Sequence, residues 1–153
     1  MAFKERDFPY SQFKFQVTIG GVQGGFQEVS GLGLEVSVTE YRDGDYSENA
    51  PMKVTSTYKV PDVTLKRGVF GREDLKIWID NVRKGKGNNG AERDTREVVI
   101  SLLSEDNQNP DPVMTWKLGK ARPIKYTGPS LNGKGTDVAV EELVLSCETM
   151  EME

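Results

Sequence analysis

The class of the fold follows from the stretch Phe13-Lys14-Phe15-Gln16-Val17-Thr18-Ile19 and from the Gly20-Gly21 pair directly after it. Apolar and polar residues alternate strictly in this stretch, as they do in a β-strand that lies with one face on a core. Two glycines can adopt the positive φ angles of a tight hairpin turn, so Val22 to Val29 is predicted to return as a second strand. Gly24-Gly25 within that return predicts a bulge or a close backbone approach.

The next predicted strand runs from Leu34 to Glu40 and alternates in the same way. Its two faces are Leu34, Val36 and Val38, expected on the core, and Glu35, Ser37 and Thr39, expected opposite it. Aspartate in place of Val36 or Val38 should then abolish folding, because it would bury an unpaired charge. Ser37→Asp should leave the fold intact.

The segment from Arg42 to Lys53 has no apolar period and is rich in Gly, Asp and Asn, which predicts a long exposed loop. A strand is predicted from Tyr58 to Arg67, interrupted by Pro61, whose missing N–H group favours an edge or a bulge. Beyond the proline, Val63 and Leu65 alternate with Thr64 and Lys66.

One helix is predicted from about Arg72 to Lys84. Its apolar residues recur at i, i+3, i+4 and i+7 and form the stripe Leu75, Trp78, Ile79 and Val82. Acidic residues in the first turn and basic residues in the last match the helix dipole. Gly85 offers a left-handed stop, and a connector is expected from there to Asp94.

Three more strands are predicted, over Arg96–Ser104, Val113–Arg122 and Val138 to about Glu148. The last is apolar on both faces and should therefore be covered on both, by this subunit or by another. The expected fold is mainly β, an antiparallel barrel or sandwich of about seven strands with one flanking helix at about 72–84. No repeat or linker divides residues 1–153, so a single domain is expected.

The composition excludes several classes of function. The 153 residues carry a net charge of −4, which argues against a dedicated nucleic-acid binder. There is no histidine, and Cys147 is the sole cysteine, so the chain can form neither an intrachain disulfide nor a thiol–imidazole zinc site. It also has no histidine to activate a serine or cysteine nucleophile. We expect no catalytic residue, no bound metal and no cofactor.

The N-terminus carries charges where a secretory signal peptide is apolar. No apolar run approaches the ~20 residues that cross a bilayer, so no direct membrane insertion is expected. Synthesis in the cytosol is the expectation from these two observations.

The strongest single motif is Gly128-Pro129-Ser130-Leu131-Asn132-Gly133-Lys134-Gly135, which is close to a phosphate-binding loop. Such a loop needs Ser or Thr directly after the lysine and a helix to receive the phosphates. Here Gly135 follows the lysine and a strand is predicted next, so the segment is interpreted as a connection between strands.

Paired carboxylates could in principle hydrolyse a glycan. The neighbours Glu141 and Glu142 point to opposite faces of a strand, which is wrong for a working pair. Trp78 lies on the helix stripe and Trp116 shares a face with Met114 and Leu118, so both are assigned to the core rather than to a ligand platform.

Three blocks of sequence, in this order, resemble the tail-tube proteins of contractile phages and of phage-like injection systems. The first block is Phe26–Leu32 followed by Glu35 and Glu40–Gly44. The second is Val63–Gly68 followed by Asp74, Leu75, Trp78, Ile79, Val82 and Gly85, and the third is Gly128–Asn132 with Val138–Leu145. The tubes of type VI secretion systems are more distant relatives of that family. The resemblance covers nearly the whole chain.

The resemblance implies a non-enzymatic tube subunit. Six copies would form a ring, the strands of all six would join into one barrel around a lumen, and the rings would stack inside a sheath. Its implied partners are further copies of itself, the sheath protein, baseplate or tube-initiator proteins, a terminal cap, and cargo or DNA in the lumen. Its implied location is a virion or a released tail-like particle, with phage and headless injection system both open.

Two groups of residues take roles on this reading. The polar faces opposite the core would line the lumen through Glu35, Ser37, Thr39, Thr64 and Lys66. The exposed loop would reach a neighbouring subunit or ring through Arg42, Asp43, Asp45, Tyr46, Glu48, Asn49 and Met52.

Two alternatives stay open at the level of sequence. A monomeric β-sandwich that binds a ligand such as a carbohydrate predicts a lone subunit with an exposed aromatic groove. A small hydrolase with paired carboxylates predicts turnover that is lost on one Asp or Glu substitution.

Overall fold

The computed structural model describes residues 14–41, 44, 52–69, 73–85, 94–105, 108 and 110–153. These contain ten strands and one helix. In chain order they are β1 (Phe15–Ile19), β2 (Val22–Gly24), β3 (Glu28–Ser30), β4 (Glu35–Tyr41), β5 (Met52–Lys59), β6 (Val63–Gly68), α1 (Asp74–Arg83), β7 (Arg96–Leu103), β8 (Pro112–Thr127), β9 (Val140–Ser146) and β10 (Thr149–Met152). The mainly β, antiparallel prediction is confirmed.

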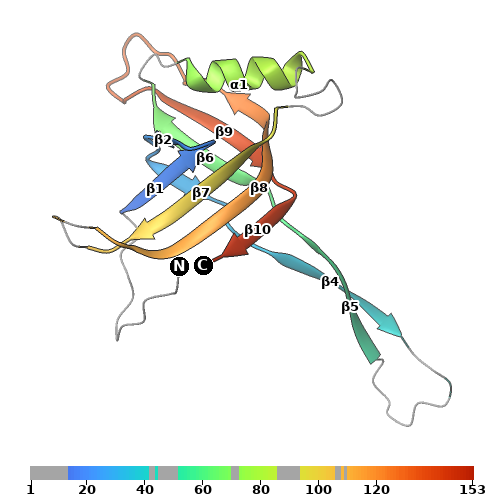
Figure 1. Cartoon of the computed structure of the whole chain (residues 1–153). Helices are drawn as coiled ribbons and strands as arrows, with labels where there is room; N and C mark the ends of the chain where they lie inside the picture. The colour runs from blue at the N-terminus through green and yellow to red at the C-terminus, as the bar shows by residue number, and fades with distance from the viewer. Residues whose placement is uncertain are drawn as a thin grey trace.

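The main sheet has the strand order β2-β1-β7-β8-β9-β6-β3, and β10 pairs with β8. The sixteen-residue strand β8 holds its two halves together, since its first part pairs with β7 and β10 and its last part with β9. The strand changes direction near Lys120, which has a positive φ of 51°. The halves face each other as a sandwich that does not close into a barrel (Figure 1).

The core lies between the two halves and under α1. Strands contribute alternate residues, because successive side chains of a strand point to opposite faces. The most deeply buried apolar side chains are Val17, Val63, Leu65, Trp78, Val98, Ile100, Leu118, Leu143 and Leu145. Trp116 is half-buried against this cluster, in agreement with its assignment to the core.

The predicted first hairpin is confirmed at its turn and corrected at its return. Gly20 and Gly21 have φ angles of 57° and 85°, as a tight turn requires. The return ends at Gly24, where a side chain would collide with the ring of Phe26, 2.6 Å away. The chain then re-enters as β3, which pairs with β6 and not with β1.

The C-terminal part holds two strands where one was predicted. β9 ends at Ser146, and β10 turns back to pair with the middle of β8. Of the β9 residues, Leu143 and Leu145 are buried, whereas Val140 and Val144 on the other face are half-buried. The described part of the chain therefore covers one face of β9 fully and the other in part.

Candidate assembly surfaces

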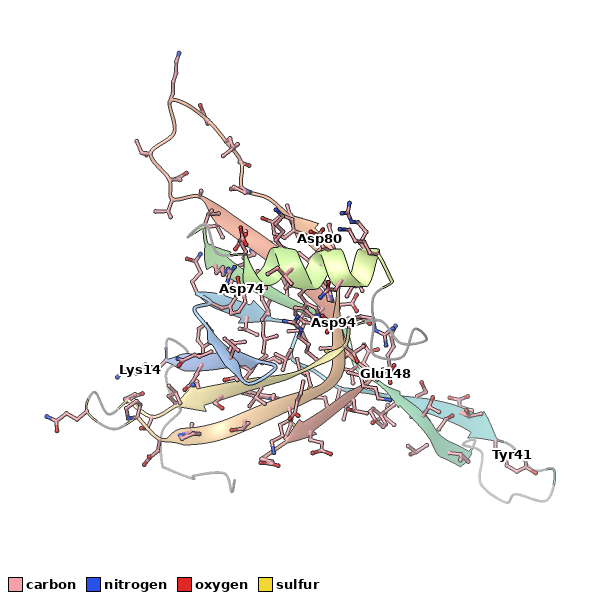
Figure 2. The ribbon with its side chains drawn as sticks, turned by 45° about the horizontal axis from the view of Figure 1, so that its top comes forward. Lys14, Tyr41, Asp74, Asp80, Asp94 and Glu148 are labelled. Atoms are coloured by element: carbon pink, nitrogen blue, oxygen red, sulfur yellow. The ribbon has the colours of Figure 1, made fainter. Side chains whose placement is uncertain are left out.

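Strands β4 and β5 form a two-stranded ribbon that leaves the body of the molecule (Figure 1). The pairing runs from Glu35 opposite Lys59 to Tyr41 opposite Met52, with an irregularity between Val36 and Val38. Figure 2 shows Tyr41 near the far end. Among the described residues each strand pairs only with the other, so the outer edges of the ribbon lack a ladder partner.

The predicted burial of Leu34, Val36 and Val38 is wrong. Their side chains are 43%, 49% and 53% exposed, and Tyr58, directly opposite Val36, is 51% exposed. Every residue of β4 is exposed, and no described second layer covers the ribbon. We call the side with Val36, Val38 and Tyr58 the valine face; Glu40 and Lys53 lie opposite each other at its outer end.

Two predictions concern the loop between the ribbon strands. Arg42, Asp43, Asp45, Tyr46, Glu48 and Asn49 lie outside the described residues. Met52 begins β5, so the predicted loop extends too far: Met52 and Lys53 already belong to a strand. Alternation over Met52–Lys59 is the sequence signal for the whole of β5, whereas the predicted strand begins only at Tyr58.

A polar face covers the half of the sheet made by β3, β6, β9 and the end of β8. Residues directly opposite each other in neighbouring strands share a face. One row across the four strands is Glu28, Lys66, Glu142 and Thr127, and the next is Ser30, Thr64, Val144 and Lys125. The first row alternates in charge, and Lys66 Nζ lies 3.7 Å from Glu28 Oε2.

The predicted lumen residues thus fall into two groups. Thr64 and Lys66 lie on the polar sheet face, opposite the buried Val63 and Leu65, which confirms that they point away from the core. The other three, Glu35, Ser37 and Thr39, lie on the exposed ribbon. The two groups belong to different sheets, which the segments at 31–34 and 60–62 connect.

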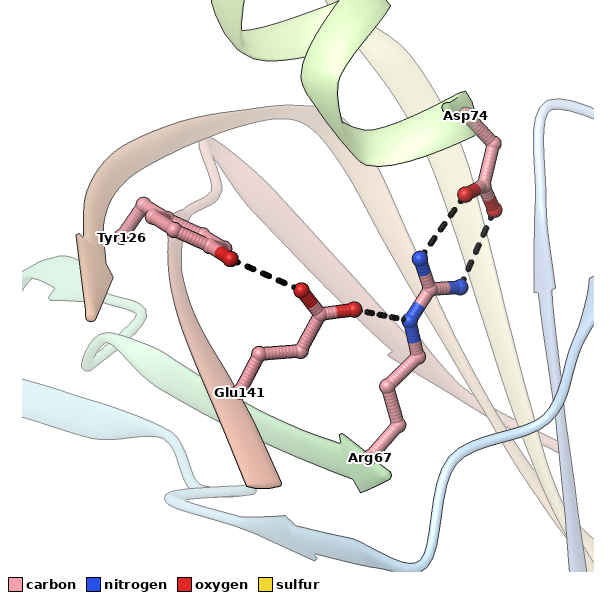
Figure 3. A network of polar contacts seen from close by, with 4 residues as sticks. All are labelled: Arg67, Asp74, Tyr126 and Glu141. Carbon is pink, nitrogen blue, oxygen red and sulfur yellow. Dashed lines mark hydrogen bonds and ion pairs between the residues drawn. The ribbon is translucent and has the colours of Figure 1, made fainter. Parts of the chain in front are cut away.

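A buried arginine joins the polar sheet to α1 (Figure 3). Arg67 is 2% exposed and donates from Nη2 and Nη1 to the two carboxylate oxygens of Asp74, at 2.8 and 3.1 Å. Its Nε donates to Glu141 Oε1 at 2.6 Å, and the Tyr126 hydroxyl donates to Glu141 Oε2 at 2.8 Å. The ring of Phe26 lies 5.5 Å from the guanidinium.

The electrostatics of this network favour its charged form. Burial alone would lower the pKa of Arg67, but the hydrogen bonds and charges of Asp74 and Glu141 outweigh it and raise that pKa. The hydrogen bond from Arg67 is the main cause that lowers the pKa of Asp74. The network ties β6, α1, β9 and the end of β8 together, and its geometry is that of a structural joint.

Helix α1 carries the predicted stripe. Leu75, Trp78 and Val82 are buried and Ile79 packs against the core, and Gly85 has the left-handed φ of 68° expected of the stop. A second joint holds the helix from the other side. Trp78 Nε1 donates to the carbonyl oxygen of Asp94 at 2.8 Å.

The carboxylate of Asp94 completes this second joint. It accepts hydrogen bonds from Asn81 at 3.1 Å and from Arg96 at 3.0 Å. Burial would raise the pKa of Asp94, but the bonds from Arg96 and Asn81 prevail and lower it. The Arg96 guanidinium also lies 5.1 Å from the Trp78 ring, so it closes the joint over the indole.

A groove of ≈ 450 Å³ runs between α1 and the end of β8. We call it the α1 groove. Its apolar lining consists of Val69, Leu75, Ile79 and Tyr126, and its charged rim of Glu73, Lys76, Asp80 and Glu141. Val69 and Tyr126 are 45% and 46% exposed, so the groove presents apolar surface to its surroundings.

We next consider the carboxylates, the thiol and the glycine-rich loop, which are the groups that could take part in catalysis or bind a ligand. Glu141 is engaged by Arg67 and Tyr126, and burial raises the pKa of the Cys147 thiol to about 11, so this thiol is protonated at neutral pH. The glycine-rich loop leads into strand β9 and not into a helix. In the described part of the chain no three His, Cys, Asp or Glu side chains form a group that could hold a metal ion.

The ten residues of α1 are too few to cross a bilayer, and within the described ranges no helix is long and apolar enough to do so.

One family model matches nearly the whole chain. The model of the T4-like virus tail tube protein gp19 family matches residues 11–151. No curated protein matches the sequence.

Solved structures share the whole fold. A chain of the sheath-tube complex of the PVC extracellular contractile injection system, in the extended state, superposes with a TM-score of 0.79 at 28% identity, covering 96% of this chain and 93% of that one. A chain of the anti-feeding prophage tube-terminating cap gives 0.80 at 26% identity, covering 98% and 94%. Hcp1 from Flavobacterium johnsoniae, at 13% identity and a TM-score of 0.52 over 90% and 93% of the two chains, shares the fold alone.

Proposed function

Because the chain belongs to the T4-like virus tail tube protein gp19 family, we propose that it is the structural subunit of the inner tube of a contractile injection system or phage tail. Six subunits form a ring, and the rings stack into a hollow tube. The observation that carries the proposal is the family match over residues 11–151, together with whole-chain similarity to chains of tube-containing injection particles.

Unpaired strand edges support self-assembly. In the described part of the chain β2 and β3 end the main sheet, β10 pairs with β8 alone, and both ribbon strands have a free outer edge. Exposed edges of this kind invite pairing with another chain, and ring closure by identical copies satisfies them without leaving a new edge. The edges of neighbouring subunits therefore meet in the ring.

The polar sheet face supports the assignment of a lumen. Its rows mix Glu28, Lys66 and Glu142 with hydroxyl groups, so the surface is hydrated and nearly balanced in charge. A passage should not hold what moves through it, and such a surface offers no large apolar patch to a passing chain. Thr64 and Lys66 line this lumen, and Glu35, Ser37 and Thr39 extend it along the ribbon.

The expected partners follow from assembly. The ribbon, together with the segment from Arg42 to Met52 that connects its strands in the sequence, contacts a neighbouring subunit or ring. A sheath surrounds the tube, baseplate or initiator proteins begin it, a cap ends it, and cargo or DNA occupies the lumen. The related chains come from a sheath-tube complex and from a tube-terminating cap. The chain is made in the cytosol and ends in a virion or a released particle.

The tube itself catalyses no reaction in this proposal. It supplies a stiff conduit, an inner passage and an outer surface on which the sheath polymerises. No cofactor or metal is needed for any of these roles.

Light scattering combined with negative-stain imaging of the purified chain tests the proposal. We expect six-membered rings and, at higher concentration, stacked tubes. A particle that stays monomeric at every concentration, and that does not join tubes seeded with a baseplate complex, would overturn the proposal and favour a ligand-binding sandwich.

A further inference from the structure

The glycine-rich loop that connects β8 to β9 has no part in the proposed function. It projects from the body of the molecule (Figure 2). Every residue from Leu131 to Val138 is exposed. Within this exposed stretch an asparagine is followed directly by a glycine, at Asn132-Gly133.

We propose that Asn132 is a site of self-modification, at which the side-chain amide becomes a carboxylate without an enzyme and the fold of the loop accelerates the conversion. The backbone nitrogen of Gly133 attacks Cγ of Asn132, so that an N–Cγ bond forms and the Cγ–Nδ2 bond breaks. The departing amide group takes up the proton of Gly133 N and leaves as ammonia. Water then opens the cyclic imide at either carbonyl, which gives aspartate or isoaspartate at this position.

A hydrogen bond inside the loop brings the reacting groups together. Lys134 N donates to Asn132 Oδ1 at 3.0 Å, and Gly135 N donates to the Asn132 carbonyl oxygen, also at 3.0 Å. The ring that the first of these bonds closes contains both Asn132 Cγ and Gly133 N. The asparagine side chain is therefore folded over the peptide that attacks it, as in other Asx turns.

The same hydrogen bond assists the attack. Negative charge develops on Asn132 Oδ1 as the nitrogen adds to Cγ. A backbone N–H group that is already aimed at such an oxygen stabilises the charge without further rearrangement. In this loop the N–H group of Lys134 has that position.

The attacking nitrogen of Gly133 is accessible. A Cβ atom placed on Gly133 would meet no atom within 4 Å, and glycine has no side chain to shield its own nitrogen. To the other described residues Gly133 N donates no hydrogen bond. Water can therefore reach this N–H group and remove its proton, which makes the nitrogen nucleophilic.

Asn81 provides a contrast within the same chain. It lies in α1 and donates from Nδ2 to Asp94 Oδ2 at 3.1 Å. The next residue is Val82, whose branched side chain crowds the backbone nitrogen and whose N–H group is engaged in the helix. Asn81 should therefore keep its amide under conditions that convert Asn132.

The conversion changes both charge and backbone of the loop. Each converted chain carries one negative charge more than the −4 of the sequence. Isoaspartate also routes the main chain through the former side chain, which lengthens the turn by one carbon atom.

Peptide mapping of the folded full chain measures the conversion. After incubation in warm, mildly alkaline buffer, trypsin releases residues 126–134 with Asn132 and residues 77–83 with Asn81. Mass spectrometry separates the amide form of each peptide from its acid form. We expect the first peptide to convert at least about tenfold faster than the second. The pair Asn89-Gly90 lies outside the described residues and falls in another peptide, so its signal does not interfere.

Two substitutions of Lys134 separate the effect of the loop from that of the dipeptide. Lys134→Pro removes the donated N–H group and keeps Asn132-Gly133, so the conversion should slow at least about threefold. Lys134→Ala keeps the N–H group and is the matched control, with an expected rate within about twofold of wild type. In both variants the tryptic peptide becomes 126–153, in which Asn132 is again the sole asparagine.

The outcomes are independent of tube assembly, because the inference makes no use of the proposed function. A rate at Asn132 no higher than at Asn81 would overturn the site. Equal rates in Lys134→Pro and Lys134→Ala would show that the loop's hydrogen bond does not accelerate the reaction, and would overturn the proposal as well.

Discussion

Arg67 and Asp74 form a two-pronged ion pair that joins the end of β6 to the first turn of α1, with Nη2–Oδ1 and Nη1–Oδ2 distances of 2.8 and 3.1 Å (Figure 3). The same guanidinium reaches Glu141 on β9, so one buried side chain fixes the helix against two strands. Charges buried in this way are costly to separate, because removal of one partner leaves the other uncompensated.

Arg67→Ala should therefore lower the free energy of unfolding by about 3 kcal/mol or more. Urea denaturation followed by circular dichroism measures the loss. Lys66→Ala is the matched control: its side chain lies on the polar face of the same strand, and a change within about 0.5 kcal/mol is expected. Equal losses of stability in both variants would show that Arg67 does not stabilise the packing of α1 on β6 and β9.

Acid should weaken this joint. The pKa of Asp74 is lowered in the folded chain, so its contribution is complete above the unfolded pKa of about 3.9 and declines as the pH falls through the lower folded value. Asp74 is half exposed, so the effect should be below about 1 kcal/mol. The urea midpoint from pH 7 to pH 3 should fall less steeply for Asp74→Asn than for wild type; parallel curves would contradict this.

The exposed ribbon predicts that Val38→Asp folds and fails to assemble. Its circular dichroism spectrum and urea midpoint should match wild type, because the new carboxylate remains in water. Leu65→Asp is the contrast: that side chain is fully buried, and an unpaired charge there should abolish the soluble fold. Loss of soluble protein in Val38→Asp would instead place Val38 in a core.

Alanine substitution of two glycines with nearly equal φ distinguishes the cost of backbone strain from the cost of steric crowding. Gly31, between β3 and β4, has φ 86°, and an added Cβ would collide with the carbonyl oxygen of Asp62. Gly21 has φ 85° with open space around it. Gly21→Ala should cost about 1 kcal/mol and Gly31→Ala clearly more, as measured by thermal or urea unfolding.

Periodicity predicted the parts of the fold in which a single element decides burial. The spacing of Leu75, Trp78, Ile79 and Val82 fixed the buried side of α1, and alternation placed Thr64 and Lys66 opposite Val63 and Leu65. Both features are local, and the structure confirms both.

Other features depend on which elements pack over a strand or pair with its edge. A local sequence pattern carries no information about those neighbours. Alternation predicted a common buried face for Val36 and Val38, but burial requires a second layer, and none of the described residues forms one there. The strand Thr149–Met152 is too short to show a period. It forms because the middle of β8 offers it a free edge.

Arg67 had a signal that the sequence interpretation did not use. It follows Val63 and Leu65 on the same side of β6, so alternation alone points a charged side chain into the core. Such a residue requires a buried partner. The identity of that partner depended on the register that sets Arg67 opposite Glu141, and register between distant strands is a property of the folded sheet.

The length of β8 has a mechanical consequence. β8 forms hydrogen bonds in both halves of the sandwich. Its first part pairs with β7 and β10, and its last part pairs with β9. An axial thrust delivered to one half passes to the other along covalent bonds, and the halves cannot slide apart unless whole rows of hydrogen bonds break at once. We therefore expect the two halves of the subunit to unfold together under load.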